Sequence, residues 1–263
     1  MEFQTVKYKE TDTMIIKGLE DLTTTFEESS IKILALKNNS YSKHYIDRIL
    51  RVEKEIKIVV EALEEWIKVQ KSWVYLEPIF AQRDIAVQME NESKKFRMQD
   101  GVYRREVNYA HIDPNVHRFC RKQGLIAELT HMNYEFEQIT KSLSTYLEAK
   151  REFFVRFYFL SNEEILEIIS QMREPRNVQK FLGKIFEGID SLQFGSDNSI
   201  QGVYSKEEEF LQLKNEINTM IHAEGWLKVL ETEMKQAVRY AIHESVQEYQ
   251  QESYDQWVQK WHG

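Results

Sequence analysis

The sequence has 263 residues and a formal net charge of −8, with 42% hydrophobic and 30% charged residues. These values predict a folded cytosolic protein and exclude a bulk-basic nucleic-acid binder, because phosphate neutralisation needs clustered Lys and Arg. There is no 18-residue apolar run for a membrane span, no apolar signal-peptide core near the N-terminus and only one cysteine, Cys120, so an internal disulfide is also excluded.

The first forty residues are predicted to form an N-terminal helical segment, domain 1–40. Apolar residues recur at helical spacing from Ile15 through Leu19 and Leu22 to Phe26. The polar run at 38–40 ends this pattern. Because the whole chain contains only 9 Gly and 3 Pro, well below average usage, long helices are favoured throughout.

The strongest periodic signal follows and opens a predicted long-helix bundle subdomain, 41–150. Nine positions step by four and three residues, and only one of them is polar: Tyr45, Ile49, Val52, Ile56, Val59, Leu63, Trp66, Gln70 and Trp73. This stripe predicts one helix of about 35 residues, roughly 50 Å long. Pro78 is expected to end that helix near residues 75–77.

An unusual density of aromatic residues marks the end of this helix, in the stretch KSWVYLEPIF. Residues at such spacing most often belong to a core. We predict that they form a structural joint, in which the aromatic end of the helix packs against a following helix: Trp66, Trp73, Tyr75, Leu76, Pro78 and Phe80.

Further helices are predicted at 92–107 and along a second stripe with the same rhythm. That stripe comprises Leu125, Leu129, Met132, Phe136, Ile139, Leu143 and Tyr146. It runs into the apolar block REFFVRFYFLS, where Phe157, Tyr158, Phe159 and Leu160 are predicted to form a packing cluster. Ser161 and Glu164 have the spacing of a capping box, which predicts the start of a short helix.

The remaining part, 151–263, is predicted to be a second helical subdomain. One helix is expected to bury Val178, Leu182, Ile185, Phe186 and Ile189, and a small β-hairpin is expected from strands at 200–204 and 210–213. A last helix carries Trp226, Leu227, Leu230, Met234, Val238, Ala241 and Ile242. The predicted fold class is therefore all-α: an elongated antiparallel helical bundle arm with a small β-hairpin near 200–213.

No motif for catalysis, cofactor binding or metal binding emerges from the residues. The sequence contains neither a Gly-x-x-x-x-Gly-Lys-Ser/Thr loop nor Gly-x-Gly-x-x-Gly. Glu128 and His131 have the Glu-x-x-His spacing of di-metal bundles, but a second copy, which such a site requires, is absent. Cys120 lies among basic residues that could lower its thiol pKa, although an unreactive thiol is the favoured interpretation.

Several segments together resemble the linker region of dynein heavy chains. WIKVQKSWVYLEPIF is followed in the family's order by RDI, KKF, YLEAKREFFVRFYFLSNEEILEIISQ, IFEGIDSLQF, GVYSKEEEF, WLKVLETEM and WVQKWHG. The resemblance covers residues 15–263. Val155 and His262 stand where the family usually has Pro, and Glu208 stands where Gly is usual in the hairpin. The short AQR segment before Asp84 is more similar to ciliary and flagellar dyneins.

The resemblance implies a mechanical role. In this family the linker lies across a ring of six AAA+ modules, and its bending and straightening produce the power stroke. It implies no catalysis in this chain, ATP and Mg²⁺ in the ring, microtubule contact only through the rest of the motor, and no nucleic-acid or membrane partner. A static spectrin-like spacer is the alternative function, although no repeat of fixed period is evident. An enzyme is the third functional hypothesis.

Overall fold

The computed structural model describes residues 1–9, 11–170 and 174–261. The chain forms two compact units, the first from Met1–Gln82 and Ala86–Leu143, and the second from Arg83–Ile85 and Ser144–Gly263. Within the described residues the protein is built from helices with two small antiparallel sheets, which confirms the predicted all-α class with a small β element. No helix among these residues combines the length and the apolar content that crossing a lipid bilayer requires.

A β-hairpin opens the first unit, and it precedes the helix that was predicted from Ile15. Strand β1 (Gln4–Lys7) pairs with β2 (Met14–Lys17), and Ile15 lies opposite Val6. Helix α1 (Leu19–Lys37) begins only after Gly18, whose φ of +66° is left-handed and interrupts any helix from Ile15. The predicted helical segment 1–40 therefore starts with strands. The prediction missed them because the spacing of four apolar residues does not reveal the break at Gly18.

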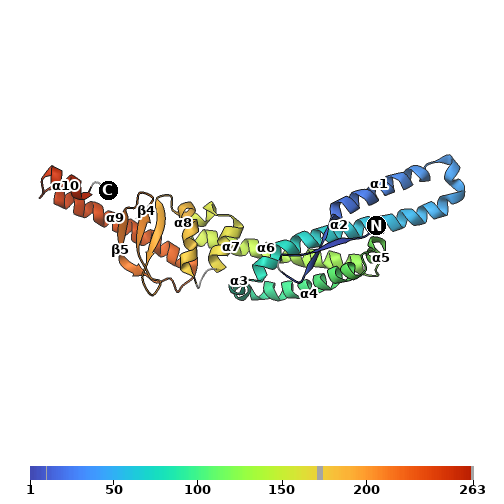
Figure 1. Ribbon diagram of the computed structural model, residues 1–263, viewed down its shortest axis with the longest axis horizontal. Coiled ribbons are helices and arrows are strands. Elements are labelled where there is room, and N and C mark those ends of the chain that lie inside the picture. Colours follow the sequence, from blue (N-terminus) through green and yellow to red (C-terminus); the bar gives the residue numbers. More distant parts are fainter. Residues whose placement is uncertain (10, 171–173, 262–263) are drawn as a thin grey trace. The chain divides into compact units, whose positions relative to one another are not determined.

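Long helices form the body of the first unit. Helix α1 turns through the 3₁₀ segment η1 (Ser40–Tyr45) into α2 (Ile46–Phe80), and the two run antiparallel (Figure 1). Helix α3 (Arg83–Gln88) leads to α4 (Glu90–Ile112), which passes through Gly101 without a break. The short α5 (Val116–Cys120) precedes α6 (Leu125–Phe153), and the boundary between the two units falls between Leu143 and Ser144.

The stripe predicted for α6 is confirmed as a buried face at six of its seven positions, which are at most 1% exposed: Leu125, Leu129, Met132, Phe136, Ile139 and Leu143. At its end Tyr146 is half-buried, and the neighbouring Leu147 is buried instead. Helix α2 differs from its prediction at one point. It continues through Pro78 to Phe80, although a proline inside a helix removes one backbone hydrogen bond.

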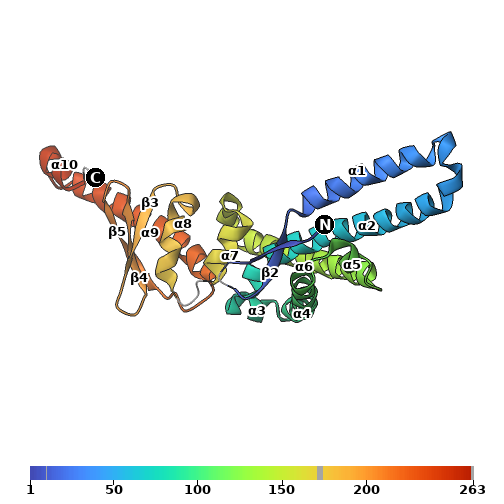
Figure 2. The ribbon, with the colours of Figure 1, turned by 45° about the vertical axis from the view of Figure 1, so that its right-hand side comes forward.

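The second unit combines short helices with a three-stranded sheet. After η2 (Val155–Phe159) come α7 (Asn162–Ser170), η3 (Pro175–Val178) and α8 (Gln179–Ile185). The sheet has the order β3 (Ile189–Phe194), β4 (Ile200–Ser205) and β5 (Phe210–Ile217), and α9 (Ala223–Tyr249) packs on β5 (Figure 2). Helix α10 (Tyr254–Trp261) follows.

The predicted hairpin is confirmed as β4 and β5, but a neighbouring prediction is wrong. The helix expected to include Phe186 and Ile189 ends at Ile185, and Ile189 begins strand β3. Phe186 has an extended backbone, and the three residues from Phe186 to Gly188 turn the chain into the sheet. A helical spacing of apolar residues also fits a helix followed by a strand when both contribute to one core.

Candidate functional site

The aromatic end of α2 lies in the interior of the first unit. Trp66, Trp73 and Leu76 are at most 1% exposed and Phe80 is 5% exposed, whereas Tyr75 and Pro78 are half-buried. The rings pack mainly on α4, which is a following helix. We therefore treat this cluster as the candidate site.

Trp73 is the centre of the cluster. Its ring stacks on Tyr103 of α4 with 4.3 Å between ring centroids, and its indole N–H donates to Asp100 Oδ1 at 2.8 Å. Asp100 also accepts from Arg104 Nε at 2.8 Å, which fixes the carboxylate. Burial raises the pKa of the Tyr103 phenol well above its ordinary value, so this ring stays neutral. The contacts combine apolar burial with a directional bond to a charged group.

Two further ring stacks extend the contact between α2 and its neighbours. Trp66 stacks on Tyr103 at 5.6 Å and meets Phe119 of α5 edge-on at 5.4 Å. About two turns before Tyr103 on α4, Phe96 stacks on Phe80 at 5.3 Å. Aromatic pairs in these geometries contribute about 0.5–1.5 kcal/mol each beyond the area they bury. Helices α2 and α4 are thus tied at several points along their length.

Gln70 explains why one position of the α2 stripe is polar. Its side-chain Oε1 accepts the backbone N–H of Ile16 at 2.9 Å, and its Nε2 donates to the carbonyl of Ile16 at 2.8 Å. The Tyr103 hydroxyl also donates to Oε1 at 3.3 Å. The amide therefore binds one residue of strand β2 as a neighbouring strand would, which anchors the hairpin to α2.

The second cluster, Phe157 to Leu160, divides into a buried and an exposed pair. Phe157 is fully buried and Leu160 is 4% exposed, whereas Tyr158 and Phe159 are 54% and 68% exposed. The 3₁₀ segment η2 places successive side chains on different sides. Only half of the predicted packing cluster therefore packs in the described structure.

The start of α7 has a reciprocal pair of side-chain bonds. The Ser161 N–H donates to Glu164 Oε2 at 2.9 Å, and the Glu164 N–H donates to Ser161 Oγ at 3.2 Å. The Lys184 ammonium, followed by the Ser161 N–H, holds the pKa of the Glu164 carboxyl below its ordinary value. Two N–H groups that a helix start leaves unpaired are satisfied in this way.

The residues considered for chemistry do not come together. Glu128 pairs with Arg105, while His131 is exposed on the next turn of α6. Among the described residues there is no group of three or more His, Cys, Asp or Glu side chains placed to hold a metal ion. Burial raises the pKa of the Cys120 thiol to about 12. This result corrects the suggestion that neighbouring basic residues lower it, because the thiol is 2% exposed and desolvation disfavours the thiolate.

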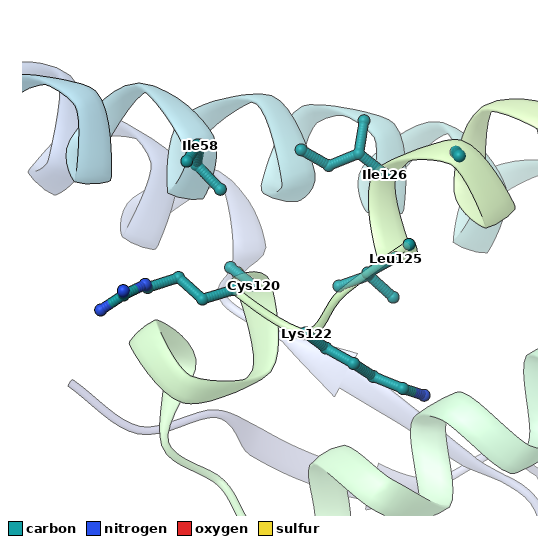
Figure 3. A pocket seen from close by; sticks show the side chains of 8 residues that line it. Ile58, Cys120, Lys122, Leu125 and Ile126 are labelled. Atoms are coloured by element: carbon teal, nitrogen blue, oxygen red, sulfur yellow. The ribbon is translucent and has the colours of Figure 1, made fainter.

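A pocket of about 330 Å³ lies beside Cys120, between α2 and the start of α6 (Figure 3). Its lining includes Ile58, Leu125 and the cations Arg121 and Lys122. Both cations already have carboxylate partners, since Lys122 Nζ lies 2.7 Å from Glu106 and Arg121 lies 3.4 Å from Glu55. The pocket therefore offers no uncommitted positive charge for an anionic ligand.

Comparison with known proteins places these features in a family. The family model for the dynein heavy chain, N-terminal region 2, matches residues 1–245. Dynein axonemal heavy chain 1 of Rattus norvegicus is 36% identical over 99% of this chain and 6% of its own length. Dynein axonemal heavy chains 3 and 12 of Mus musculus are 35% and 34% identical over all of this chain, which covers 6% and 9% of their lengths. The chain thus spans less than a tenth of these relatives.

Proposed function

Because this chain belongs to the dynein heavy chain family, we propose that it forms the mechanical linker of an axonemal dynein motor. The matched region is an N-terminal region of the heavy chain. The linker acts as a lever that bends and straightens over the AAA+ ring of the same polypeptide. Its partners are that ring and, through the rest of the motor, the microtubule of a cilium or flagellum.

The proposal assigns the chemistry elsewhere in the heavy chain. This segment performs no catalysis, and ATP and Mg²⁺ bind in the ring. In support, the sequence contains no phosphate-binding loop of either common kind. The role that remains for the segment is to receive a conformational change and transmit force.

The observation that carries the lever proposal is the packing between α2 and α4. A lever must resist deformation under load, and close-packed interiors change between discrete arrangements instead of deforming smoothly. Trp73 supplies such packing through its stack on Tyr103 and its bond to Asp100. The two helices are therefore expected to move as one body.

The test uses a full-length axonemal heavy chain that contains this segment. Trp73→Ala should slow microtubule gliding several-fold while the ring continues to hydrolyse ATP, because the lever is weakened and the ATP sites are intact. Tyr41→Phe, at a side chain that is 91% exposed, is the control and should change neither rate. Unchanged gliding velocity in Trp73→Ala, with the segment folded, would instead support a static helical spacer.

A further inference from the structure

Pro78 creates a defect in α2 that the helix itself cannot repair. A proline has no N–H, so the carbonyl of Val74, four residues earlier, loses its helical partner. The proline ring also crowds that carbonyl and tilts it away from the helix axis. Yet α2 continues to Phe80, and the Ala81 N–H still donates to the Glu77 carbonyl at 2.9 Å.

The N-terminal hairpin supplies the missing donor. Tyr8 follows strand β1, and its hydroxyl donates to the Val74 carbonyl at 3.3 Å. The same ring packs edge-on against Trp73, with 5.1 Å between centroids, and is 5% exposed. Tyr8 therefore both covers the defect and hydrogen-bonds the backbone group that Pro78 leaves unpaired.

A second attachment lies one turn earlier on the same face of α2. Residues 70, 74 and 78 are four apart and form one row along a helix. Gln70 binds the backbone of Ile16 through both ends of its amide, at 2.9 and 2.8 Å. The hairpin thus contacts α2 at two successive turns, at Gln70 and at the Val74 carbonyl.

The hairpin is also held by α4 and α5, so it bridges three helices. Thr13 accepts a hydrogen bond from Arg104 of α4. Phe3 packs edge-on against Phe119 of α5 at 5.3 Å, and its N–H donates to the Pro114 carbonyl at 2.7 Å. A two-stranded hairpin has little stability of its own, so its position depends on these attachments.

We infer that the N-terminal hairpin, residues 1–9 and 11–17, is a clasp that keeps α2 continuous across Pro78, and that release of the clasp opens a hinge at Val74–Pro78. With the clasp in place, the Val74 carbonyl is paired and the last turns of α2 stay helical. With the clasp released, a carbonyl without a partner and a proline remain at one point of the helix. This inference goes beyond the proposed lever function, and it holds for the chain whatever motor carries it.

A double-variant cycle read by amide hydrogen exchange tests the clasp. Tyr8→Phe removes only the hydroxyl and should accelerate exchange at residues 79–82 about fivefold, the loss expected for one hydrogen bond. Pro78→Ala restores an N–H that can bind the Val74 carbonyl within the helix. In that background Tyr8→Phe should no longer accelerate exchange at 79–82.

Two further variants complete the design. Gln70→Leu should accelerate exchange over the same turns, because it removes both bonds to Ile16. Tyr41→Phe, at an exposed ring, is the matched control and should have no effect.

The clasp would be overturned if Tyr8→Phe does not accelerate exchange, or if it accelerates exchange equally with and without Pro78→Ala. If Tyr8→Phe destabilises the whole first unit, rescue by Pro78→Ala supports the clasp and lack of rescue refutes it. Gliding assays are not needed, so the result is independent of the proposed function.

Discussion

Helices α2 and α9 both carry an apolar stripe at helical spacing, and they differ in where along the helix that stripe is buried. In α2 burial increases toward the C-terminal end, since Val52 and Ile56 are half-buried, whereas Val59 and Trp73 are 0% exposed. In α9 it decreases, from Leu227 at 0% to Ile242 at 59%. The face predicted for α9 is thus buried only in its first part.

The neighbours of each helix account for this difference. The buried end of α2 meets α4, α5 and the N-terminal hairpin, which cover it from several sides. Helix α9 packs against β5 and α7, but these neighbours leave Val238 and Ile242 exposed in the described structure. An apolar stripe therefore predicts a helix, and the elements around that helix decide how much each residue of the stripe contributes to the free energy of unfolding.

The largest expected effect is at the buried end of α2. Trp73→Ala should lower the free energy of unfolding by about 3–5 kcal/mol, because it leaves a large cavity and removes the hydrogen bond to Asp100. Ile242→Ala, in the exposed part of α9, should change it by less than about 0.5 kcal/mol. Urea denaturation of both variants measures the difference, and similar losses would contradict the comparison.

The same contrast is expected within α9 alone. Leu230→Ala should cost about 2–5 kcal/mol, because Leu230 is fully buried. Val238→Ala, two turns later and 45% exposed, should cost less than about 0.5 kcal/mol. Thermal unfolding of the two variants tests this gradient. A large loss in Val238→Ala would show that this part of α9 is covered in solution.

A finer comparison separates ring burial from hydrogen bonding in α2. The Trp73 N–H donates to Asp100, whereas the Trp66 N–H is buried with no partner among the described residues. Trp73→Phe should therefore cost about 1.5–3 kcal/mol more than Trp66→Phe, the value of a hydrogen bond to a charged group. Chemical denaturation of both variants measures this excess. Equal losses would mean that packing alone stabilises the joint.

Helix α7 extends the comparison to a short helix that depends on its cap. Ser161→Ala should lower the free energy of unfolding by about 1 kcal/mol, whereas α2 begins without a side-chain cap.

The pKa of Glu164 is lowered in the folded state. The contribution of its carboxylate to stability is therefore present above the ordinary value of 4.5 and is lost as pH falls through the lowered pKa.

The acid dependence can be measured with Glu164→Gln. This variant should be less stable than the parent near neutral pH, and the difference should shrink as pH falls below 4.5. Melting temperatures across this range test the sign. A difference that grows in acid would contradict the assigned role of the carboxylate.

Local spacing alone predicted much of this protein. The α2 and α6 stripes, the short helix after Ser161 and the β4–β5 hairpin were all predicted, because amphipathic periodicity and capping chemistry act between near neighbours in the chain. The aromatic end of α2 was singled out for the same reason. Gln70 was visible as the only polar position in its stripe, but its partner was not.

Only the tertiary structure decided the remaining features. The continuation of α2 past Pro78 depends on Tyr8, which lies 66 residues away from Val74 in the sequence. The hairpin that carries Tyr8 is held by Gln70, and the exposure of Val238 and Ile242 depends on which elements lie beside α9. Such contacts join residues far apart in the chain, so local propensity and periodicity carry no information about them.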